Sequence, residues 1–163
     1  RPEVSLRIPG AHRTVLAAAR IQGGLLVPAQ RAEFEALGVG LEQFAGKARA
    51  QSSGLLEKIT PELRRDRRKV VEVAILRSND PRLPALVLEA GFAARFEAWF
   101  GGKMLVAIPN AGVIYVFPSL AGSHSAYGGE VLSAYKNATH PVSLEVFEIG
   151  KGVPLRAVGA FEE

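Results

Sequence analysis

The densest group of chemically reactive side chains lies between residues 122 and 130. It contains two hydroxyls, an imidazole, a phenol and a carboxylate, carried by Ser123, His124, Ser125, Tyr127 and Glu130. An imidazole beside hydroxyls can serve as the general base for a serine nucleophile in hydrolases and transferases. The segment lacks the G-x-S-x-G pattern of a nucleophile elbow, and small polar residues are equally typical of a connecting loop. An enzyme with its site in the loop 119–130, near Tyr115, is therefore the alternative interpretation.

The highest local density of charge lies in residues 64–69, RRDRRK. The cations of this run are Arg64, Arg65, Arg67, Arg68 and Lys69. Closely spaced cations can bind phosphates or an acidic partner and release counterions together. No aromatic residue interleaves them to stack on bases, and a solvated charged approach to a buried strand explains the run equally well. The sequence disfavours nucleic acid as a partner and leaves weak nucleic-acid or acidic-partner binding as a second alternative.

The aromatic residues between 92 and 100 recur at helical spacing. They are Phe92, Phe96, Trp99 and Phe100. Such a stripe more often forms a hydrophobic core than a ligand cage. Trp99 stands next to Gly101-Gly102, where a helix is expected to end, so we expect its ring to be partly exposed. The helix face around Trp99 is a candidate interface.

Several kinds of chemistry are absent from the composition. The chain has no cysteine, which excludes disulfides, thiol catalysis, Cys-ligated zinc and iron–sulfur clusters. The three histidines are isolated from one another, and only two aspartates are present, so no metal-ligand spacing is seen. Gly101-Gly102-Lys103 lacks the spacing of a P-loop, and no G-x-G-x-x-G occurs. We therefore predict no metal and no cofactor.

The length of 163 residues fits one domain, and the net charge of +4 suits solubility as well as binding. We expect a single domain over 1–163, with a helical N-terminal subregion at about 11–63. No apolar run approaches 18 residues, so no membrane span is predicted. The sequence begins at Arg1 rather than Met, so we expect residues upstream to have been removed. The compartment, cytoplasmic or exported, is left open.

In the N-terminal half, alternating apolar residues predict a short strand within 2–10. Ala-rich residues 12–22 favour a helix that ends at Gly23-Gly24. Apolar residues at three- and four-residue spacing predict a helix over 28–50 that breaks near residue 39. A further helical segment is expected over 55–63, with Pro61 at a first helical position, followed by a strand buried on both faces over 70–76.

In the C-terminal half, residues 83–100 favour a helix bent at Gly91. Two apolar runs around Pro109-Asn110-Ala111-Gly112 predict a hairpin at about 104–117, and residues 130–137 predict a short helix. A second hairpin is expected at about 143–161, around Gly150-Lys151-Gly152. These elements predict an α+β fold, with a mostly antiparallel sheet of about five strands and helices packed on one face.

Because the recognisable catalytic arrangements are missing, the sequence favours a non-catalytic binding or protein-interaction module. Its partner would be a small ligand, another protein or a second copy of the chain in a homo-oligomer. The sequence identifies neither the ligand nor the partner.

Overall fold

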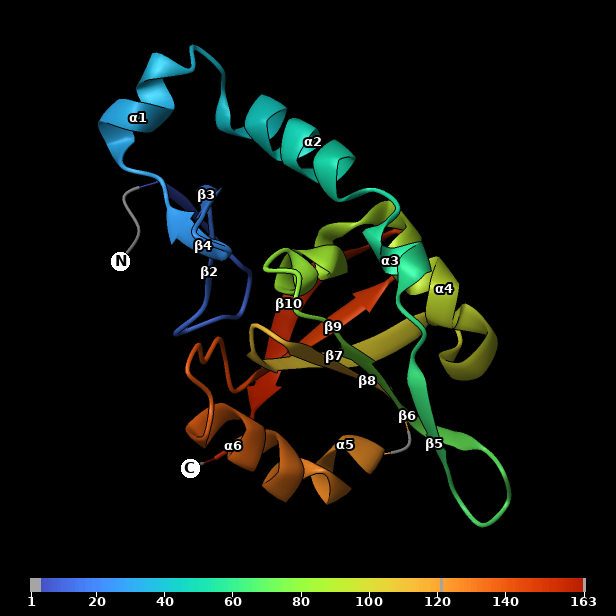
Figure 1. The fold of residues 1–163 in the computed structure, drawn as a ribbon. Helices are drawn as coiled ribbons and strands as arrows, with labels where there is room; N and C mark the ends of the chain where they lie inside the picture. Colours follow the sequence, from blue (N-terminus) through green and yellow to red (C-terminus); the bar gives the residue numbers. More distant parts are fainter. Residues whose placement is uncertain (1–3, 121, 163) are drawn as a thin grey trace.

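The computed structural model describes residues 4–120 and 122–162 (Figure 1). Its centre is a six-stranded antiparallel sheet with the strand order β10-β9-β7-β8-β6-β5. The strands are β5 (Glu62–Arg65), β6 (Val71–Arg77), β7 (Lys103–Asn110), β8 (Val113–Pro118), β9 (Glu145–Gly150) and β10 (Val153–Ala160). The predicted α+β class and antiparallel sheet are confirmed, with six strands in place of about five.

Both predicted C-terminal hairpins are present. In the first, β7 and β8 are joined by Ala111-Gly112, and the side-chain oxygen of Asn110 accepts the Gly112 N–H at 2.9 Å. In the second, β9 and β10 are joined across Lys151-Gly152. Alternating apolar residues and short polar turns are local features, so each hairpin forms where the sequence predicts it.

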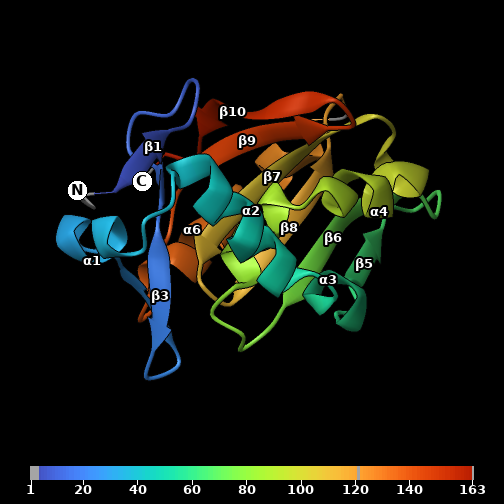
Figure 2. The same ribbon diagram turned by 90° about the horizontal axis from the view of Figure 1, so that it is seen from above.

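Helices cover both faces of the sheet, not one face as the sequence suggested (Figures 1 and 2). One face packs against α3 (Leu55–Lys58), the 3₁₀ helix η1 (Leu83–Leu88) and α4 (Ala90–Phe100). The other face packs against α5 (Ser123–Ala126) and α6 (Gly128–Lys136). Within β6, Ala74 and Leu76 face α4, whereas Val73 and Ile75 face α6, as the pleat of a strand requires.

The segment predicted as one helix over 83–100 contains two helices. The break lies at Glu89, whose extended backbone (ψ 136°) separates η1 from α4, and not at Gly91. Phe92, Phe96 and Phe100 are buried against the sheet, which is why the aromatic stripe has helical spacing.

The N-terminal residues contain strands that the sequence analysis missed. They are β1 (Ser5–Arg7), β2 (Val15–Ala17), β3 (Ala19–Gln22) and β4 (Leu25–Pro28). The predicted helix over 12–22 is therefore wrong, and Gly23-Gly24 forms the turn of the hairpin β3–β4, with φ angles of 59° and 77°. The predicted strand within 2–10 forms only over β1, and Pro2 and Glu3 lie outside the described residues.

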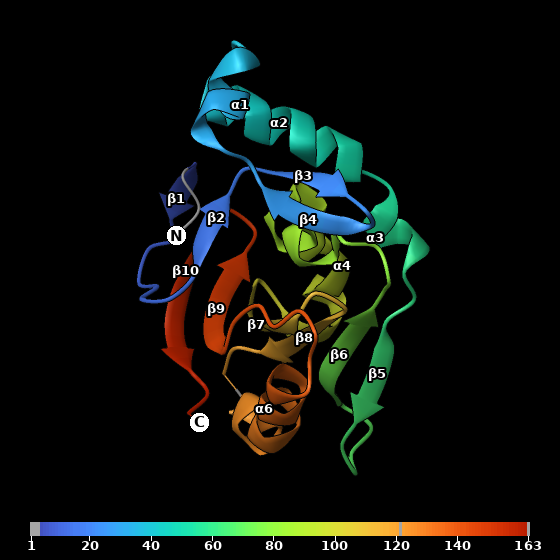
Figure 3. The same cartoon turned by 60° about the vertical axis from the view of Figure 1, so that its left-hand side comes forward.

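The helix predicted over 28–50 is present as α1 (Arg31–Ala36) and α2 (Leu41–Ser52), with the expected break between them. The helical segment predicted over 55–63 ends early, because α3 stops at Lys58 and β5 begins at Glu62. We call residues 4–52 the N-terminal arm. Its α1, α2 and β3–β4 lie together at one end of the molecule, away from α6 (Figures 1 and 3). Of the arm, only Ile8, Ala18 and Ser52 are buried.

The segment predicted as the loop 119–130 contains α5 and the first turn of α6, and Ala121 lies outside the described residues. The helix predicted over 130–137 is confirmed as α6, which begins two residues earlier. Within the described ranges, the structure has no helix with the length and apolar character needed to cross a membrane.

Candidate functional site

Two residues singled out for different reasons, Arg64 and Glu130, meet on the α6 face of the sheet. Arg64 lies opposite Val73 in the β5–β6 register, so its side chain points to the face that α6 covers. Its guanidinium donates hydrogen bonds to Glu130 at 2.6 Å and to Glu62 at 3.0 Å. The hydroxyl of Tyr115 donates to the other Glu130 oxygen at 3.1 Å. We call Glu62, Arg64, Tyr115 and Glu130 the Arg64 cluster.

Arg64 faces two carboxylates in the Arg64 cluster, and Arg77, whose Nε lies 3.8 Å from Glu62, supplies a second positive charge beside it. The hydrogen bond from Arg64 holds the pKa of the Glu130 carboxyl below its ordinary value, and the same contact raises the pKa of Arg64. Burial, followed by the nearby charge of Glu130, raises the pKa of the Tyr115 hydroxyl. These shifts keep Glu130 ionised and Tyr115 neutral around pH 7, so neither of these two groups exchanges a proton readily there.

Tyr127 and Ser123 both contact Glu72 on β6. The Tyr127 hydroxyl lies 3.4 Å from the Glu72 carboxylate, and the Ser123 hydroxyl lies 3.4 Å from the Glu72 backbone oxygen. The guanidinium of Arg64 stands 5.8 Å from the centre of the Tyr127 ring. Burial and then the charge of Glu72 raise the pKa of Tyr127. These contacts fix α5 against the sheet.

The imidazole of His124 lies between two aromatic rings. Its centre is 6.3 Å from that of Phe117 and 6.4 Å from that of Phe161, both in edge-on contacts. Its Nδ1 atom is buried and has no hydrogen-bond partner among the described residues. Ser125, the other candidate nucleophile, is exposed. A catalytic role for Ser123, His124 and Ser125 stays a prediction, and the geometry supplies no hydrogen-bonded base and nucleophile among them.

The remaining cations of residues 64–69 form the exposed end of the hairpin β5–β6. Asp66 builds this turn by accepting the N–H groups of Arg68 at 2.7 Å and Val70 at 2.9 Å. We call Arg65, Arg67, Arg68 and Lys69, all exposed, the basic tip. The structure thus separates the five cations that were predicted to act together. Arg64 points to α6, and the other four extend into solvent.

Trp99 is 37% exposed on α4 and packs against the buried ring of Phe96, with the ring centres 6.1 Å apart. Its partial exposure agrees with the sequence-based expectation. A role for this face as an interface stays a prediction.

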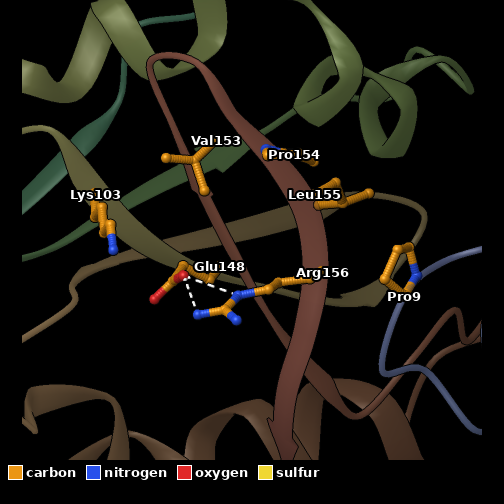
Figure 4. A pocket seen from close by; sticks show the side chains of 7 residues that line it. All are labelled: Pro9, Lys103, Glu148, Val153, Pro154, Leu155 and Arg156. Carbon is orange, nitrogen blue, oxygen red and sulfur yellow. Dashed lines mark hydrogen bonds and ion pairs between the residues drawn. The ribbon is translucent and has the colours of Figure 1, made fainter.

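A shallow pocket of about 410 Å³ lies beside β10 (Figure 4). Its walls include Pro9, Val153 and Leu155. On its floor, the Arg156 guanidinium donates two hydrogen bonds to one oxygen of Glu148, at 3.0 and 2.7 Å. This ion pair uses one oxygen of Glu148, and the side chain of Lys103, which forms no ion pair with the described residues, lines the same pocket.

A second cavity, of about 450 Å³, lies between α2, the start of α4 and the turn between β9 and β10. We call it the α4 groove. Its apolar wall consists of Val87, Leu88, Ala93, Ile149, Val153 and Leu155. Its charged residues are Arg49 on α2, Glu89 before α4 and Lys151 in the turn. The Glu89 Oε1 atom is buried and has no hydrogen-bond partner among the described residues.

Backbone geometry positions two of the charged residues of the α4 groove, Glu89 and Lys151. Glu89 occupies the N-cap position of α4, yet its side chain makes no capping hydrogen bond. The turn carrying Lys151 packs so closely on the turn before β7 that a Cβ at Gly150 would collide with the Gly102 carbonyl. Gly152 adopts a positive φ of 71°, which glycine tolerates best. In the sequence, Gly150-Lys151-Gly152 indicates only a hairpin tip, and neither Arg49 nor Glu89 belongs to a recognisable motif.

Among the described residues, no group of three His, Asp or Glu side chains could hold a metal ion. Comparison of the chain with protein-family models, with curated proteins and with solved structures gave no match. What the chain can bind must therefore follow from its own side chains.

Proposed function

We propose that this chain is a non-catalytic binding domain whose ligand occupies the α4 groove. The observation that carries the proposal is the Glu89 side chain, which lines the groove and whose carboxylate, with its Oε1 atom buried, has no hydrogen bond or ion pair with the described residues. A buried polar atom without a partner costs about 1–3 kcal/mol, and more when it is charged. A ligand that donates a hydrogen bond to the accessible part of this carboxylate would recover part of that free energy on binding.

The Arg64 cluster supports the non-catalytic part of the proposal. General acid–base catalysis works best with a group whose pKa lies near the working pH. The pKa of Glu130 is lowered by Arg64, and that of Tyr115 is raised by burial. Both shifts move the pKa of the group further from pH 7. This cluster has the character of a structural ion-pair network.

The dimensions of the α4 groove support a small ligand. Its volume of about 450 Å³ falls within the roughly 300–1,000 Å³ of small-molecule sites. Such sites combine a mostly apolar wall with a few polar groups that fix the orientation of the ligand. The groove has nearly as much polar as apolar lining, which suits a small ligand with charged groups beside an apolar part. A protein partner or a second copy of the chain, expected from the sequence, stays a prediction.

The test is a thermal-shift screen of a small-molecule library against the wild type and two tryptophan variants. Ala90 is exposed and lines the groove, so Ala90→Trp should fill it without disturbing the core. Ala94, one turn further along α4, is exposed and does not line the groove, so Ala94→Trp is the matched control.

We expect the screen to find compounds that raise the Tm of the wild type and of the control variant Ala94→Trp. The same compounds should leave the Tm of Ala90→Trp unchanged. The proposal is wrong if no compound shifts the wild type, or if every active compound stabilises Ala90→Trp equally.

A further inference from the structure

We propose that the ligand of the α4 groove is a small zwitterion with an apolar side chain, the chemical class of amino acids and of short peptides with free termini. This inference rests on the proposed function and adds the chemistry of the ligand. It comes from three features of the groove, which are its cations, its unpartnered carboxylate and its apolar wall.

The cations of the groove are Arg49 and Lys151, which come from α2 and from the β9–β10 turn. Neither forms an ion pair with another described residue. Both side chains are exposed and have only donors, so a ligand that meets them in the groove is favoured by an acceptor such as a carboxylate. One end of the groove's ligand should therefore be an anion.

Glu89 favours a ligand group of the opposite charge, a cationic hydrogen-bond donor. A carboxylate only accepts hydrogen bonds, and the Glu89 carboxylate, which lines the groove, has no donor from the described chain. A ligand ammonium group has three N–H donors and the charge that Glu89 favours. An anion without an amine would leave the Glu89 carboxylate without a donor, and a simple cation would be repelled by Arg49 and Lys151. A ligand that carries both charges satisfies all three side chains.

The apolar wall determines the rest of the ligand. Aliphatic side chains from η1, α4, β9 and β10 line the cavity, and among them Val87, Val153 and Leu155 are only partly buried. An apolar side chain of the ligand would cover these atoms, and its own surface would also be removed from water. A polar zwitterion such as diglycine would lack this contribution.

The probe for the experiment is the dipeptide Leu-Leu, measured by isothermal titration calorimetry against the intact chain. We expect binding of Leu-Leu and at least tenfold weaker binding of its N-acetylated form, its C-terminal amide and Gly-Gly. In Glu89→Gln, the preference for a free amine over its acetylated form should fall. In Lys151→Met and Arg49→Met, the preference for a free carboxylate over its amide should fall.

Matched controls separate these effects from general changes of charge. Glu97→Gln changes an exposed carboxylate on the same helix, and Lys136→Met changes an exposed cation on α6. Both should bind all probes as the wild type does. Circular dichroism and unfolding curves show whether each variant is folded.

The outcomes distinguish the two proposals. If library compounds bind in an Ala90-dependent way but free and capped dipeptides bind equally, or none of them binds, the zwitterion inference is wrong and the groove remains a binding site. If Leu-Leu binds equally well to Ala90→Trp, both the inference and the proposed function of the groove are wrong.

Discussion

At the scale of single residues, Glu145 is the main polar contact between the N-terminal arm and the sheet. It lies on β9 and is only 5% exposed. Its carboxylate accepts the backbone N–H groups of His12, Arg13 and Thr14 at 2.6, 3.3 and 2.9 Å. The loop between β1 and β2 therefore depends on one buried charge. Burial alone would raise the pKa of this carboxyl, but the hydrogen bonds outweigh burial and lower it.

Replacing this carboxylate should destabilise the fold. We expect Glu145→Gln to lower the free energy of unfolding by about 2 kcal/mol, because N–H groups lose a charged acceptor in a buried place. The control is Glu148→Gln, which breaks an ion pair with the exposed Arg156 and should cost less than about 1 kcal/mol. Urea unfolding measures both values. Equal losses in the two variants would contradict the assigned role of Glu145.

The same carboxylate predicts a dependence of stability on pH. A carboxyl with a lowered pKa in the folded state stabilises that state above its ordinary pKa, here 4.5. This stabilisation disappears as the pH falls through the lowered pKa. The difference in unfolding free energy between the wild type and Glu145→Gln should thus be constant from pH 7 to about 5 and shrink below pH 4.5. Urea unfolding at a series of pH values measures it, and a difference that is independent of pH would refute the prediction.

At the scale of elements, the β9–β10 turn is held by close backbone packing. A Cβ at Gly150 would collide with the Gly102 carbonyl oxygen, so Gly150→Ala should displace the turn and destabilise the fold by about 1–3 kcal/mol. Because Lys151 moves with the turn, binding in the α4 groove should weaken as well. Gly46→Ala is the control. Gly46 lies inside α2 with no atom within 4 Å of a new Cβ, so this change should stabilise by about 0.5–1 kcal/mol.

The elements that the sequence predicted correctly are those with local signals. The hairpin β7–β8 has alternating strands and a short turn, and both are visible without knowledge of the fold. The failure over 12–22 has a physical reason. Alanine favours helices in isolation, but here Ala19–Gln22 pairs with Leu25–Pro28 across Gly23-Gly24, and pairing overrides propensity. A Gly-Gly turn between two apolar runs was the missed signal.

The placement of helices on both faces of the sheet was also partly predictable from the sequence. Residues 70–76 were interpreted as a strand buried on both faces, which is incompatible with helices on only one face. Val73 and Ile75 do face α6, and Ala74 and Leu76 face α4. The apolar pattern of this strand, taken by itself, therefore predicted the layers better than the order of the elements did.

The candidate sites were less predictable because they join segments that are distant in the sequence. Arg64 and Glu130 were each singled out, but only the register of β5 on β6 and the packing of α6 bring them together. Arg49, Glu89 and Lys151 come from three separate segments. No pattern within any one segment indicates a cavity between them.

The N-terminal arm should be the least stable part of the structure. Between residues 4 and 52 only Ile8, Ala18 and Ser52 are buried, while Ile21 and Leu37 are more than half exposed. Short helices and isolated two-stranded hairpins are marginal in water without such burial. Hydrogen–deuterium exchange should be about 100-fold or more faster in α1, α2 and β3–β4 than in β6, β7 and β8. Uniform protection across these elements would contradict this.

At the scale of the whole molecule, the α4 groove joins the arm to the core. Arg49 belongs to α2, whereas Glu89 and Lys151 belong to elements packed on the sheet. The end of α2 is tied to the core by a hydrogen bond from Arg82 to the Gln51 carbonyl at 2.7 Å. A ligand that contacts Arg49 should therefore slow hydrogen exchange in α2. In Arg49→Met, the same ligand should leave exchange in α2 unchanged.

The distribution of charge over the molecule gives the last prediction. The net charge is +4, and four exposed cations are concentrated in the basic tip, Arg65, Arg67, Arg68 and Lys69. Arg64 does not belong to this surface, because Glu130 and Glu62 already bind its guanidinium. We expect heparin to bind weakly at about 50 mM salt, with log K falling against log salt at a slope no steeper than about −4, and to dissociate near physiological salt.

A comparison of two variants with equal net charge tests whether the basic tip causes this binding. Changing its four cations to glutamine lowers the net charge from +4 to 0. Changing four scattered, exposed cations, Arg7, Lys47, Lys58 and Lys136, to glutamine gives the same net charge of 0. Closely spaced cations release more counterions from one ligand than scattered ones do, so the tip variant should lose most of the affinity and the control only a minor part. Equal losses would mean that net charge alone attracts heparin, and the tip would then be only a solvated turn that keeps the edge strand β5 from pairing with other chains.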